Sequence, residues 1–552
     1  MKWLKDHPFA LVLLLVLLIF LPHLGVLPVN IMEARNFITA REMLTDGNWL
    51  HTTLNGFPRY EKPPLPTWLT AIAGAAGGLQ QVWVLRLPAV LVLGFLHFMT
   101  RWLCFEWIGD SAYAATGIIV LSTSFFMTWS GRNGQWDIFT HGFMMGAIYF
   151  LYLWIATPQH AVRNAALAAF FIGCSFMSKG PVSVYALLLP FLISWGIVYR
   201  FRHPVTGYRK ISLRAFLIFA VIVVVTSGWW HLYIYLSDPI ALHEITSREV
   251  NNWHSYNVRP WYYYWDFFLQ SGLWSVPSVF GLMYFYLRHR VSDKKAYTFT
   301  FIWVVTAVIL LSLIPEKKSR YLLPVLIPLS LNTAFYLEYL FRTPRENQRN
   351  TDRWFNRIHH GLLAIVALCI PIIGYFFPGE YPGSLKIWFL LLSVAGIGTG
   401  VLMWRSLVRR DIRTSFLCSL LLMISLIIFG LPLSRAIMSN PEYKDLSELP
   451  LFEEATGMRT YAYKEIPAEM VWSYGDKIPV LPAGDIGAVP GKDFRVLVAE
   501  EDQQEFFAEF RKFDLRKETF YNMSAHGKGE KRFNSRLYRD LYLVRHKQAG
   551  TL

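Results

Sequence analysis

The segment Ile31–Trp68, IMEARNFITAREMLTDGNWLHTTLNGFPRYEKPPLPTW, follows an apolar run long enough to cross a bilayer but is itself too polar to cross one. Its first part, Glu33–Leu44, predicts a short amphipathic helix that ends at Asp46 and Gly47. Its second part, RYEKPP at residues 59–64, places three charges beside a proline pair. A helix lying on the membrane surface is the simplest interpretation of such a loop, but it leaves these charges unexplained.

The composition is that of a polytopic membrane protein. The 552 residues are 54% hydrophobic and only 16% charged, whereas a soluble protein carries about 25% charge. Apolar blocks near 20 residues long match the length that spans about 30 Å of hydrocarbon. The first block lacks a small-residue cleavage site, so we expect it to be retained. We expect about 13 spanning helices, near residues 8–28, 84–103, 111–129, 138–156, 163–178, 180–199, 214–236, 263–287, 297–314, 321–341, 359–377, 384–404 and 414–437.

Basic residues between the apolar blocks predict the orientation of the chain. Four Arg- and Lys-rich loops, at residues 200–214, 288–295, 342–357 and 405–413, fall on the same side of the 13 predicted spans as Lys2 and Lys5. The positive-inside rule assigns that side to the cytoplasm. The net charge of +15 is thereby explained by the membrane, and we expect no nucleic-acid partner.

The chain divides into two predicted domains. Residues 1–437 form the membrane domain, and residues 438–552 follow on the opposite, outer side of the membrane. In this tail charges become frequent and apolar runs shorten to strand length, as at Arg495–Ala499 and Leu541–Val544, while Glu501–Phe513 has helical periodicity. The tail therefore predicts a small α/β domain.

Cations are disfavoured in short outer loops, yet the predicted outer loops of this chain carry many of them. They are Arg35, Arg59, Lys62, Arg132, Lys179, Arg248, Arg259, Lys317, Lys318 and Arg320. Snorkelling of a long side chain to lipid headgroups accounts for any one of these residues. The set as a whole favours a site for an anionic ligand at the membrane face, because lysine offers a point charge and arginine a bidentate fork.

Acidic and aromatic residues lie among these cations. The carboxylates are Glu33, Glu61, Asp137 and Glu316. Asp137 lies at the mouth of a spanning helix, where a carboxylate either pairs with a cation or takes part in chemistry, and both readings remain open. The aromatic run at residues 253–265 either contacts a sugar ring or a lipid tail, or forms an interfacial aromatic belt.

Four short motifs lie on the predicted outer side. They are x-E-x-R at Glu33 and Arg35, Y-E-K-P-P at residues 60–64, an aspartate at a helix mouth at Asp137, and M-S-K-G at residues 177–180. In this order they resemble glycosyltransferase family 39. The family consists of polyprenyl-phosphate-sugar-dependent enzymes of the GT-C fold. It includes bacterial transferases that add 4-amino-4-deoxy-L-arabinose to lipid A and, more distantly, protein O-mannosyltransferases. The resemblance runs from the N-terminus to about Tyr321, so it implies a GT-C-type bundle with amphipathic helices in the outer loops.

The resemblance and the set of outer cations together suggest roles for the site residues. Glu33 and Asp137 are the catalytic candidates. The candidates for binding the donor phosphate are Arg35, Tyr60, Lys62, Lys179, Arg259, Lys317, Lys318 and Arg320. The family usually begins its first motif with Asp-Glu and uses that aspartate in catalysis, whereas this chain has Met32-Glu33. Either Glu33 or Asp137 takes the role, or less base is needed.

Some family members hold zinc or another divalent ion near the outer loops, which makes Glu61 a candidate metal ligand. No second ligand for such an ion is identifiable in the sequence. The four cysteines include no CxxC pair, so neither a disulfide framework nor a zinc knuckle is expected.

The sequence thus predicts transfer of a sugar from a polyprenyl (undecaprenyl) phosphate carrier to an acceptor at the periplasmic face of a bacterial inner membrane. Lipid A or lipopolysaccharide is the first candidate acceptor, and membrane lipids are expected partners. The alternatives within this fold are a protein O-glycosyltransferase and a polysaccharide-modifying transferase. A transporter or flippase of lipid-linked sugars is the alternative from another class, and it would call for mid-bilayer charges and repeated halves, neither of which is evident.

Overall fold

The computed structural model describes residues 7–204, 207, 212–344, 348–376, 383–434, 440–481 and 493–546. The basic residues Lys2, Lys5, Arg209, Lys210 and Arg345 and the side chains of Trp253 and His254 lie outside this description. The chain divides into two compact units. The first comprises Met1–Val26, Tyr60–Leu69 and Arg86–Leu433, and the second comprises Leu27–Arg59, Thr70–Leu85 and Ser434–Leu552.

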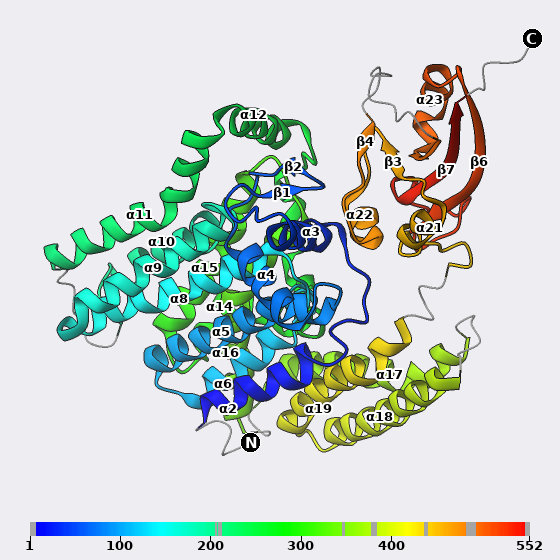
Figure 1. Ribbon diagram of the computed structural model, residues 1–552. Coiled ribbons are helices and arrows are strands. Elements are labelled where there is room, and N and C mark those ends of the chain that lie inside the picture. Colours follow the sequence, from blue (N-terminus) through cyan, green and yellow to red (C-terminus); the bar gives the residue numbers. More distant parts are fainter. Residues whose placement is uncertain are drawn as a thin grey trace, which may run out of the picture. The chain divides into compact units, whose positions relative to one another are not determined.

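The first unit is a bundle of long apolar helices (Figure 1). Within the described ranges, nine helices are long and apolar enough to cross a membrane, or ten if one bent pair counts as a single span. The main helices are α5 (Val82–Ile108), α8 (Trp136–Ala156), α9 (Ala161–Lys179), α10 (Leu189–Tyr199), α11 (Leu213–Ser237), α15 (Lys294–Leu313), α16 (Leu326–Arg342), α17 (Asn350–Phe376), α18 (Gly383–Val408) and α19 (Ile412–Ser425). The prediction of a mainly helical membrane protein is confirmed.

Several expected spans are shorter or broken. The first consists of α2 (Pro8–Leu15) and the π-helix η1 (Val16–Phe20). The span expected at 111–129 is split into α6 (Ser111–Ser122) and α7 (Phe125–Gly131), which are bent by 69°. The span expected at 180–199 has only a short apolar helix, Val184–Tyr199.

The segment expected as one helix at 263–287 is instead four short helices. These are η4 (Trp261–Tyr264), η5 (Phe267–Trp274), α13 (Ser275–Leu282) and α14 (Tyr284–Leu287). Gly272 has a φ of 60°, a backbone conformation that interrupts a right-handed helix. A side chain there would also lie within 2.6 Å of Phe125, so this break is fixed by close packing.

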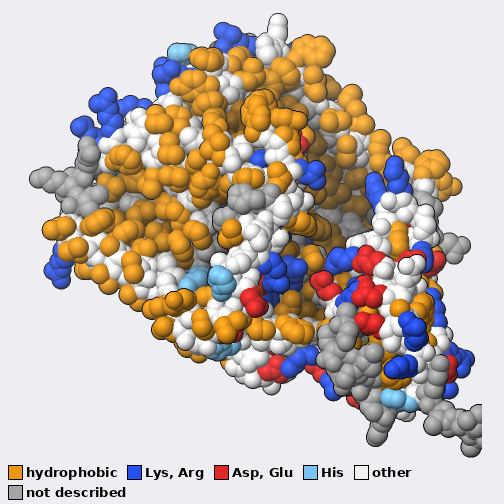
Figure 2. All heavy atoms as spheres, turned by 90° about the horizontal axis from the view of Figure 1, so that it is seen from above, with side chains coloured by type: hydrophobic (Ala, Val, Ile, Leu, Met, Phe, Trp, Pro, Cys, Tyr) orange, Lys and Arg blue, Asp and Glu red, His pale blue; other side chains and the backbone are white. Residues whose placement is uncertain are grey.

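Exposed apolar side chains cover the helical part in Figure 2, and charged side chains are denser on the part that contains the strands. On α11, Leu213, Val224 and Leu236 are all more than 70% exposed. Such a helix is stable only where lipid covers it. The buried core of the first unit therefore lies between the helices, and their outer faces suit a bilayer.

The second unit contains a five-stranded sheet in the order β4-β3-β5-β7-β6. The strands are β3 (Thr460–Tyr463), β4 (Val480–Leu481), β5 (Phe494–Val498), β6 (Phe513–Asn522) and β7 (Tyr538–His546). β3 runs parallel to β4 and β5, and β7 is antiparallel to β5 and β6. The strands expected at 495–499 and 541–544 are thus present. The helix expected at 501–513 is shorter, since α23 (Gln503–Glu509) ends before β6 begins at Phe513.

The first predicted outer loop folds with this sheet. Helix α3 (Ile31–Thr45) fulfils the prediction of a short helix, and Ala34 and Ile38 share a buried cluster with Val471 of α22 (Ala468–Tyr474). A hairpin of β1 (Thr53–Leu54) and β2 (Phe57–Pro58) follows. Its turn, Asn55-Gly56, has positive φ at both residues, as a type I′ turn requires. The expected domain 438–552 therefore corresponds to the last segment of a unit that also includes Leu27–Arg59.

Candidate active site

Asp137 and Lys179 form a buried ion pair in the first unit. Asp137 lies in the first turn of α8, and Lys179 is the last residue of α9. The two helices pack side by side and are joined by a short turn (Figure 1), so the start of α8 meets the end of α9. The Lys179 Nζ lies 2.5 Å from Asp137 Oδ1, and the side chains are 6% and 3% exposed. Both charges also suit the dipoles of their helix ends. Of the two alternatives for Asp137, pairing with a cation and taking part in chemistry, the structure therefore shows the first.

Three cations surround the ring of Tyr321, and we call Lys179, Lys318 and Arg320 the cation cluster. The Lys179 Nζ, the Lys318 Nζ and the Arg320 Cζ lie 5.5, 6.0 and 5.8 Å from the ring centroid. Each distance is within the range of a cation–π contact. Three residues that the sequence analysis selected are therefore brought together. Tyr321, which holds them, was not selected, although its place directly after KKSR was a usable signal.

The charge of the cluster is incompletely balanced. Lys318 pairs with Glu316 at 2.5 Å, and Arg320 interacts electrostatically with both members of the Asp137–Lys179 pair. Three cations thus face two carboxylates. In the described part of the chain, Asp137 Oδ2 and Arg320 Nε are buried and have no hydrogen-bond partner. Buried polar atoms of this kind are normally satisfied, so the site suits an anionic ligand that also brings a hydrogen-bond donor.

A neighbouring segment fixes the backbone of the cluster. Val258 and Glu316 form an antiparallel bridge, and the amide of Lys317 donates to the Asn257 carbonyl at 3.1 Å. The Tyr264 hydroxyl accepts from the amide of Lys318 at 3.0 Å and donates to the same residue's carbonyl at 3.1 Å. This bridge and these hydrogen bonds join the segment 256–264 to the segment 315–320.

Lys317 has a structural position that the sequence did not predict. Its Nζ donates to the carbonyls of Ile314 at 2.5 Å and Arg259 at 3.1 Å, and so satisfies the C-terminal end of α15. The side chain is buried, and this burial lowers the pKa of Lys317. The ammonium is engaged with the backbone oxygens of Ile314 and Arg259, and its role in phosphate binding stays a prediction. The side chain of Arg259 is exposed.

The Y-E-K motif contacts helix α12 (Pro239–Ser255) and the residue that precedes it. The Tyr60 hydroxyl donates to Asp238 at 2.9 Å, Glu61 pairs with Arg248 at 2.8 Å, and Lys62 lies 3.7 Å from Glu249. Tyr60 is also in one buried cluster with Met177 of the M-S-K-G motif. The Y-E-K-P-P and M-S-K-G motifs thus pack together through Tyr60 and Met177. Met177 stands two positions before Lys179 in the sequence.

The residues around Glu61 do not fit a metal ion. Its Oε1 accepts from a cation, Arg248, and although its Oε2 has no hydrogen-bond partner, one carboxylate oxygen is not a metal site. Across the described residues, no group of three or more His, Cys, Asp or Glu side chains is arranged to hold an ion. We therefore assign no step to a metal.

Glu33 and Arg35 belong to the second unit. Asn30 and Glu33 form a capping box at the start of α3, in which Glu33 Oε2 accepts from the Asn30 side chain at 2.8 Å. Glu33 is fully buried, whereas Arg35 is exposed. The N-x-x-E spacing that signals a capping box was present in the sequence and was missed.

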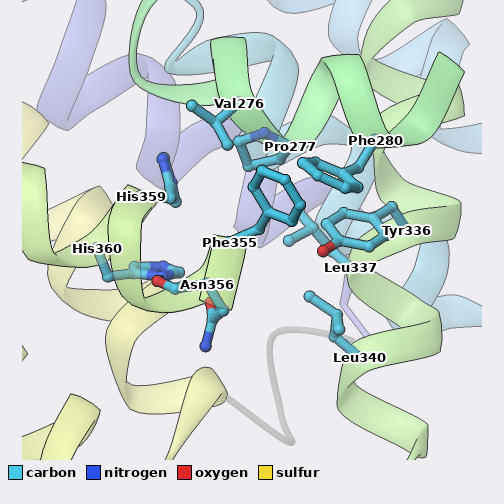
Figure 3. A pocket seen from close by; sticks show the side chains of 10 residues that line it. All are labelled: Val276, Pro277, Phe280, Tyr336, Leu337, Leu340, Phe355, Asn356, His359 and His360. Atoms are coloured by element: carbon cyan, nitrogen blue, oxygen red, sulfur yellow. The ribbon is translucent and has the colours of Figure 1, made fainter. Parts of the chain in front are cut away.

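A small pocket between α13, α16 and α17 is lined by residues that belong to none of these motifs (Figure 3). The ring of Phe355 packs on Phe280 at 4.0 Å, with Tyr336 beside them. His359 and His360 complete one side, with their ring centroids 4.5 Å apart. Its described lining contains no charged side chain, so it does not suit an anionic ligand.

Comparison with known proteins agrees with this description, although no family model matches the chain. It is 26% identical over 381 residues to undecaprenyl phosphate-alpha-4-amino-4-deoxy-L-arabinose arabinosyl transferase 1 of Proteus mirabilis, across 66% of each chain. It is 24% identical over 474 residues to the transferase of that name from Pectobacterium atrosepticum, across 82% of this chain and 80% of the relative. The match to the Proteus protein spans just under two thirds of that relative's length.

The fold matches that of a solved structure over nearly its whole length. The crystal structure of ArnT from Cupriavidus metallidurans bound to undecaprenyl phosphate superposes with a TM-score of 0.65 and 16% identity, covering 98% of both chains. Its apo form gives a TM-score of 0.60 over 97% of both chains. The chain therefore has the GT-C fold of ArnT and is a sequence relative of the undecaprenyl-phosphate aminoarabinose transferases, as its motifs predicted.

Proposed function

We propose that this protein is a glycosyltransferase of a bacterial inner membrane. It moves a sugar from a polyprenyl phosphate carrier, undecaprenyl phosphate, to an acceptor on the periplasmic face, with lipid A or lipopolysaccharide as the first candidate. The observation that carries the proposal is the cation cluster around Tyr321. The names of the relatives, which include the same carrier and an aminoarabinose, support it.

The cation cluster acts on the leaving group. As the bond between the sugar and the phosphate breaks, negative charge builds on the phosphate oxygen. Lys318 and Arg320 stabilise that charge, because preplaced cations at a partly buried site need no reorganisation when the charge forms. Arginine contributes directional bonds and lysine a point charge. The polyprenyl chain extends into lipid from the same depth.

Asp137 acts on the acceptor. Lys179 holds Asp137 Oδ1, which leaves Oδ2 to accept a hydrogen bond from the attacking group or to take its proton. A phosphate acceptor is largely ionised at neutral pH and needs orientation more than deprotonation. Glu33 is the second candidate for the role that the family aspartate has elsewhere, and Glu33→Gln tests it against Asp137→Asn.

The membrane orientation is part of the same proposal. The basic loops support an N-terminus in the cytoplasm and an α/β domain, with the site, in the periplasm. Single cysteines at the exposed positions Ser447 and Thr351 test this with a membrane-impermeant maleimide and the parent protein as background. We expect Ser447→Cys to react in cells whose outer membrane alone is permeabilised, and Thr351→Cys only after the inner membrane is opened. Equal reaction at both positions would contradict the orientation.

A transfer assay tests the reaction. Purified protein receives a polyprenyl-phosphate-linked sugar with lipid A, a polysaccharide or a peptide as acceptor, and mass spectrometry follows both the free polyprenyl phosphate and the product. We expect stoichiometric release of carrier and sugar transfer to lipid A. Transfer only to the peptide would identify a protein O-glycosyltransferase, and transfer only to the polysaccharide would identify a polysaccharide-modifying transferase. Movement of intact donor across vesicles without release of carrier would identify a flippase.

A further inference from the structure

An exposed row of aromatic side chains adjoins the cation cluster, and we call Tyr256, Trp261, Tyr262 and Trp265 the aromatic ledge. Their side chains are between 56 and 61% exposed. Trp261 begins the short helix η4 and Trp265 directly follows its end, and their ring centroids lie 4.7 Å apart. Large exposed rings that contact one another rather than a core need an external partner.

The ledge is rigidly joined to the cation cluster. It begins at Tyr256, whose ring centroid lies 4.9 Å from the Lys318 Nζ. It continues along the segment that pairs with residues 315–317 and ends beyond Tyr264, whose hydroxyl holds both backbone groups of Lys318. A molecule bound on the ledge is therefore held at a fixed position relative to the cluster, as a second substrate must be.

Charges within the ledge distinguish it from a plain interfacial belt. Arg259 and Asp266 are exposed, and in the sequence Arg259 stands between Tyr256 and Trp261 while Asp266 directly follows Trp265. Tryptophan and tyrosine offer a rigid flat apolar face with a polar edge, which matches a pyranose ring that has a C–H face and a hydroxyl rim. Arg259 adds a fork for an anionic substituent.

We propose that the aromatic ledge is the acceptor subsite and that it binds the saccharide headgroup of an anionic glycolipid. One sugar ring stacks on Trp261 and Trp265, and Arg259 binds a phosphate on that sugar. The inference rests on the proposed glycosyltransferase function and adds the residues that select the acceptor. It moves Arg259 from the donor phosphate to the acceptor.

Equilibrium binding tests the subsite without requiring turnover. The probe is a water-soluble phosphorylated glucosamine disaccharide that lacks acyl chains, titrated calorimetrically into full-length protein in detergent micelles. We expect the double variant Trp261→Ala/Trp265→Ala to bind it at least about tenfold more weakly than the parent, a typical loss for two hot-spot aromatics. Affinity for a short polyprenyl phosphate should be unchanged. Trp354→Ala, which removes a 66% exposed tryptophan from the start of α17, is the matched control and should change neither affinity.

Two further variants sharpen the result. Trp261→Phe/Trp265→Phe keeps flat rings and should retain most of the affinity, which an unfolded site would not. The parent should prefer the phosphorylated probe over the same disaccharide without phosphate, and Arg259→Ala should abolish that preference.

Three outcomes would overturn the inference: no binding of the probe by the parent, unchanged binding by the double alanine variant, or equal loss of polyprenyl phosphate affinity. If the double alanine variant bound the probe more weakly in bilayers but not in micelles, the ledge would be an interfacial aromatic belt. Failure of the proposed function would instead appear in the parent as absence of transfer from the donor to any acceptor, whatever the probe does.

Discussion

The carboxylate of Asp137 and the ammonium of Lys179 share a 2.5 Å hydrogen bond at the point where α8 begins and α9 ends. The two charges depend on each other, because removal of either side chain leaves the other charge buried without its partner. The pair also fixes one oxygen of Asp137 and leaves the second without a hydrogen bond among the described residues. A structural and a catalytic role are therefore compatible in the same residue.

A double-mutant cycle separates these two roles. We expect Asp137→Asn and Lys179→Met each to lower the free energy of unfolding by about 3–5 kcal/mol, the usual loss when one partner of a buried pair is removed. The double variant should lose less than the sum, since no lone charge remains. Turnover should fall at least about 100-fold in Asp137→Asn and should not recover in the double variant. Thermal unfolding in detergent and single-turnover transfer measure the two effects. Strictly additive stability losses would contradict the pairing.

Adjacent lysines should behave differently in carrier binding. We expect Lys318→Ala and Arg320→Ala each to weaken binding of a short-chain polyprenyl phosphate about tenfold or more, because one charge-assisted contact contributes about 1.5–3 kcal/mol. Lys317→Met should leave that affinity within about twofold but lower the melting temperature, since the carbonyls of Ile314 and Arg259 lose their donor. Lys294→Ala, at an exposed position outside the site, should change neither quantity. Equal loss of affinity at Lys317 and Lys318 would contradict the distinction.

Much of this architecture was predictable because hydrophobic length and charge are properties of the sequence itself. The apolar blocks predicted a mainly helical membrane protein, although nine or ten of the 13 expected spans are long apolar helices in the described ranges. The motifs pointed to Asp137 and Lys179. The break at Gly272 was missed, although Ser271-Gly272 and Pro277 are local signals of a break in the sequence. Only the structure shows that close packing against Phe125 requires glycine there. The different positions of Lys317 and Lys318 could not be predicted, because the two residues are of the same type. Backbone pairing with residues 257–259 alone decides which ammonium reaches a carbonyl and which reaches Tyr321.

The first outer loop was predicted only in part. Its helix was predicted from periodicity, but its packing against α22, more than 400 residues later, has no local signal. Glu33 was selected through a resemblance, and the capping role it has in the structure follows from a simple N-x-x-E spacing. The sequence therefore carried a local signal for the structural role of Glu33.

The ion pair between Asp46 and Lys477 predicts a pH-dependent stability of the second unit. The two groups lie 2.8 Å apart. The hydrogen bond from Lys477 lowers the pKa of Asp46, and the same bond raises the pKa of Lys477. A carboxylate with a lowered pKa stabilises the fold above its ordinary pKa of about 4, and that contribution is lost as the pH falls through the lowered value. An amine with a raised pKa contributes below about 10.4 and loses its contribution as the pH rises through the raised value.

Comparison of the parent with Asp46→Asn therefore gives a defined pH profile. We expect the parent to melt at the higher temperature between about pH 5 and 9, with the difference shrinking below about pH 4 as Asp46 is protonated. Lys477→Met should show the same plateau and the same decline in acid. Thermal unfolding at a series of pH values measures this. A difference that is constant down to pH 2 would contradict the assignment.

Asn55 holds the β1–β2 hairpin against the loop after α22. Its side-chain amide donates to the Ile478 carbonyl at 2.9 Å and accepts from the Ile478 amide at 2.8 Å, so it pairs with that residue as a neighbouring strand would. Its φ of 56° adds a second requirement. Asn55→Gly removes the hydrogen bonds but tolerates the backbone, whereas Asn55→Ala removes the bonds and also strains the turn.

The two substitutions at Asn55 should therefore differ. We expect Asn55→Gly to cost about 1–3 kcal/mol for two hydrogen bonds, and Asn55→Ala to cost about 1 kcal/mol more because alanine is disfavoured at positive φ. Protease cleavage near the hairpin should rise in the same order, measured on the full-length protein under native conditions. Pro158 to His160, a short turn between α8 and α9 in the other unit, should keep its protection in both variants. If alanine were tolerated better than glycine, the hairpin would not need the left-handed turn. If neither variant lost stability, the pairing of Asn55 with Ile478 would not be what fixes this loop.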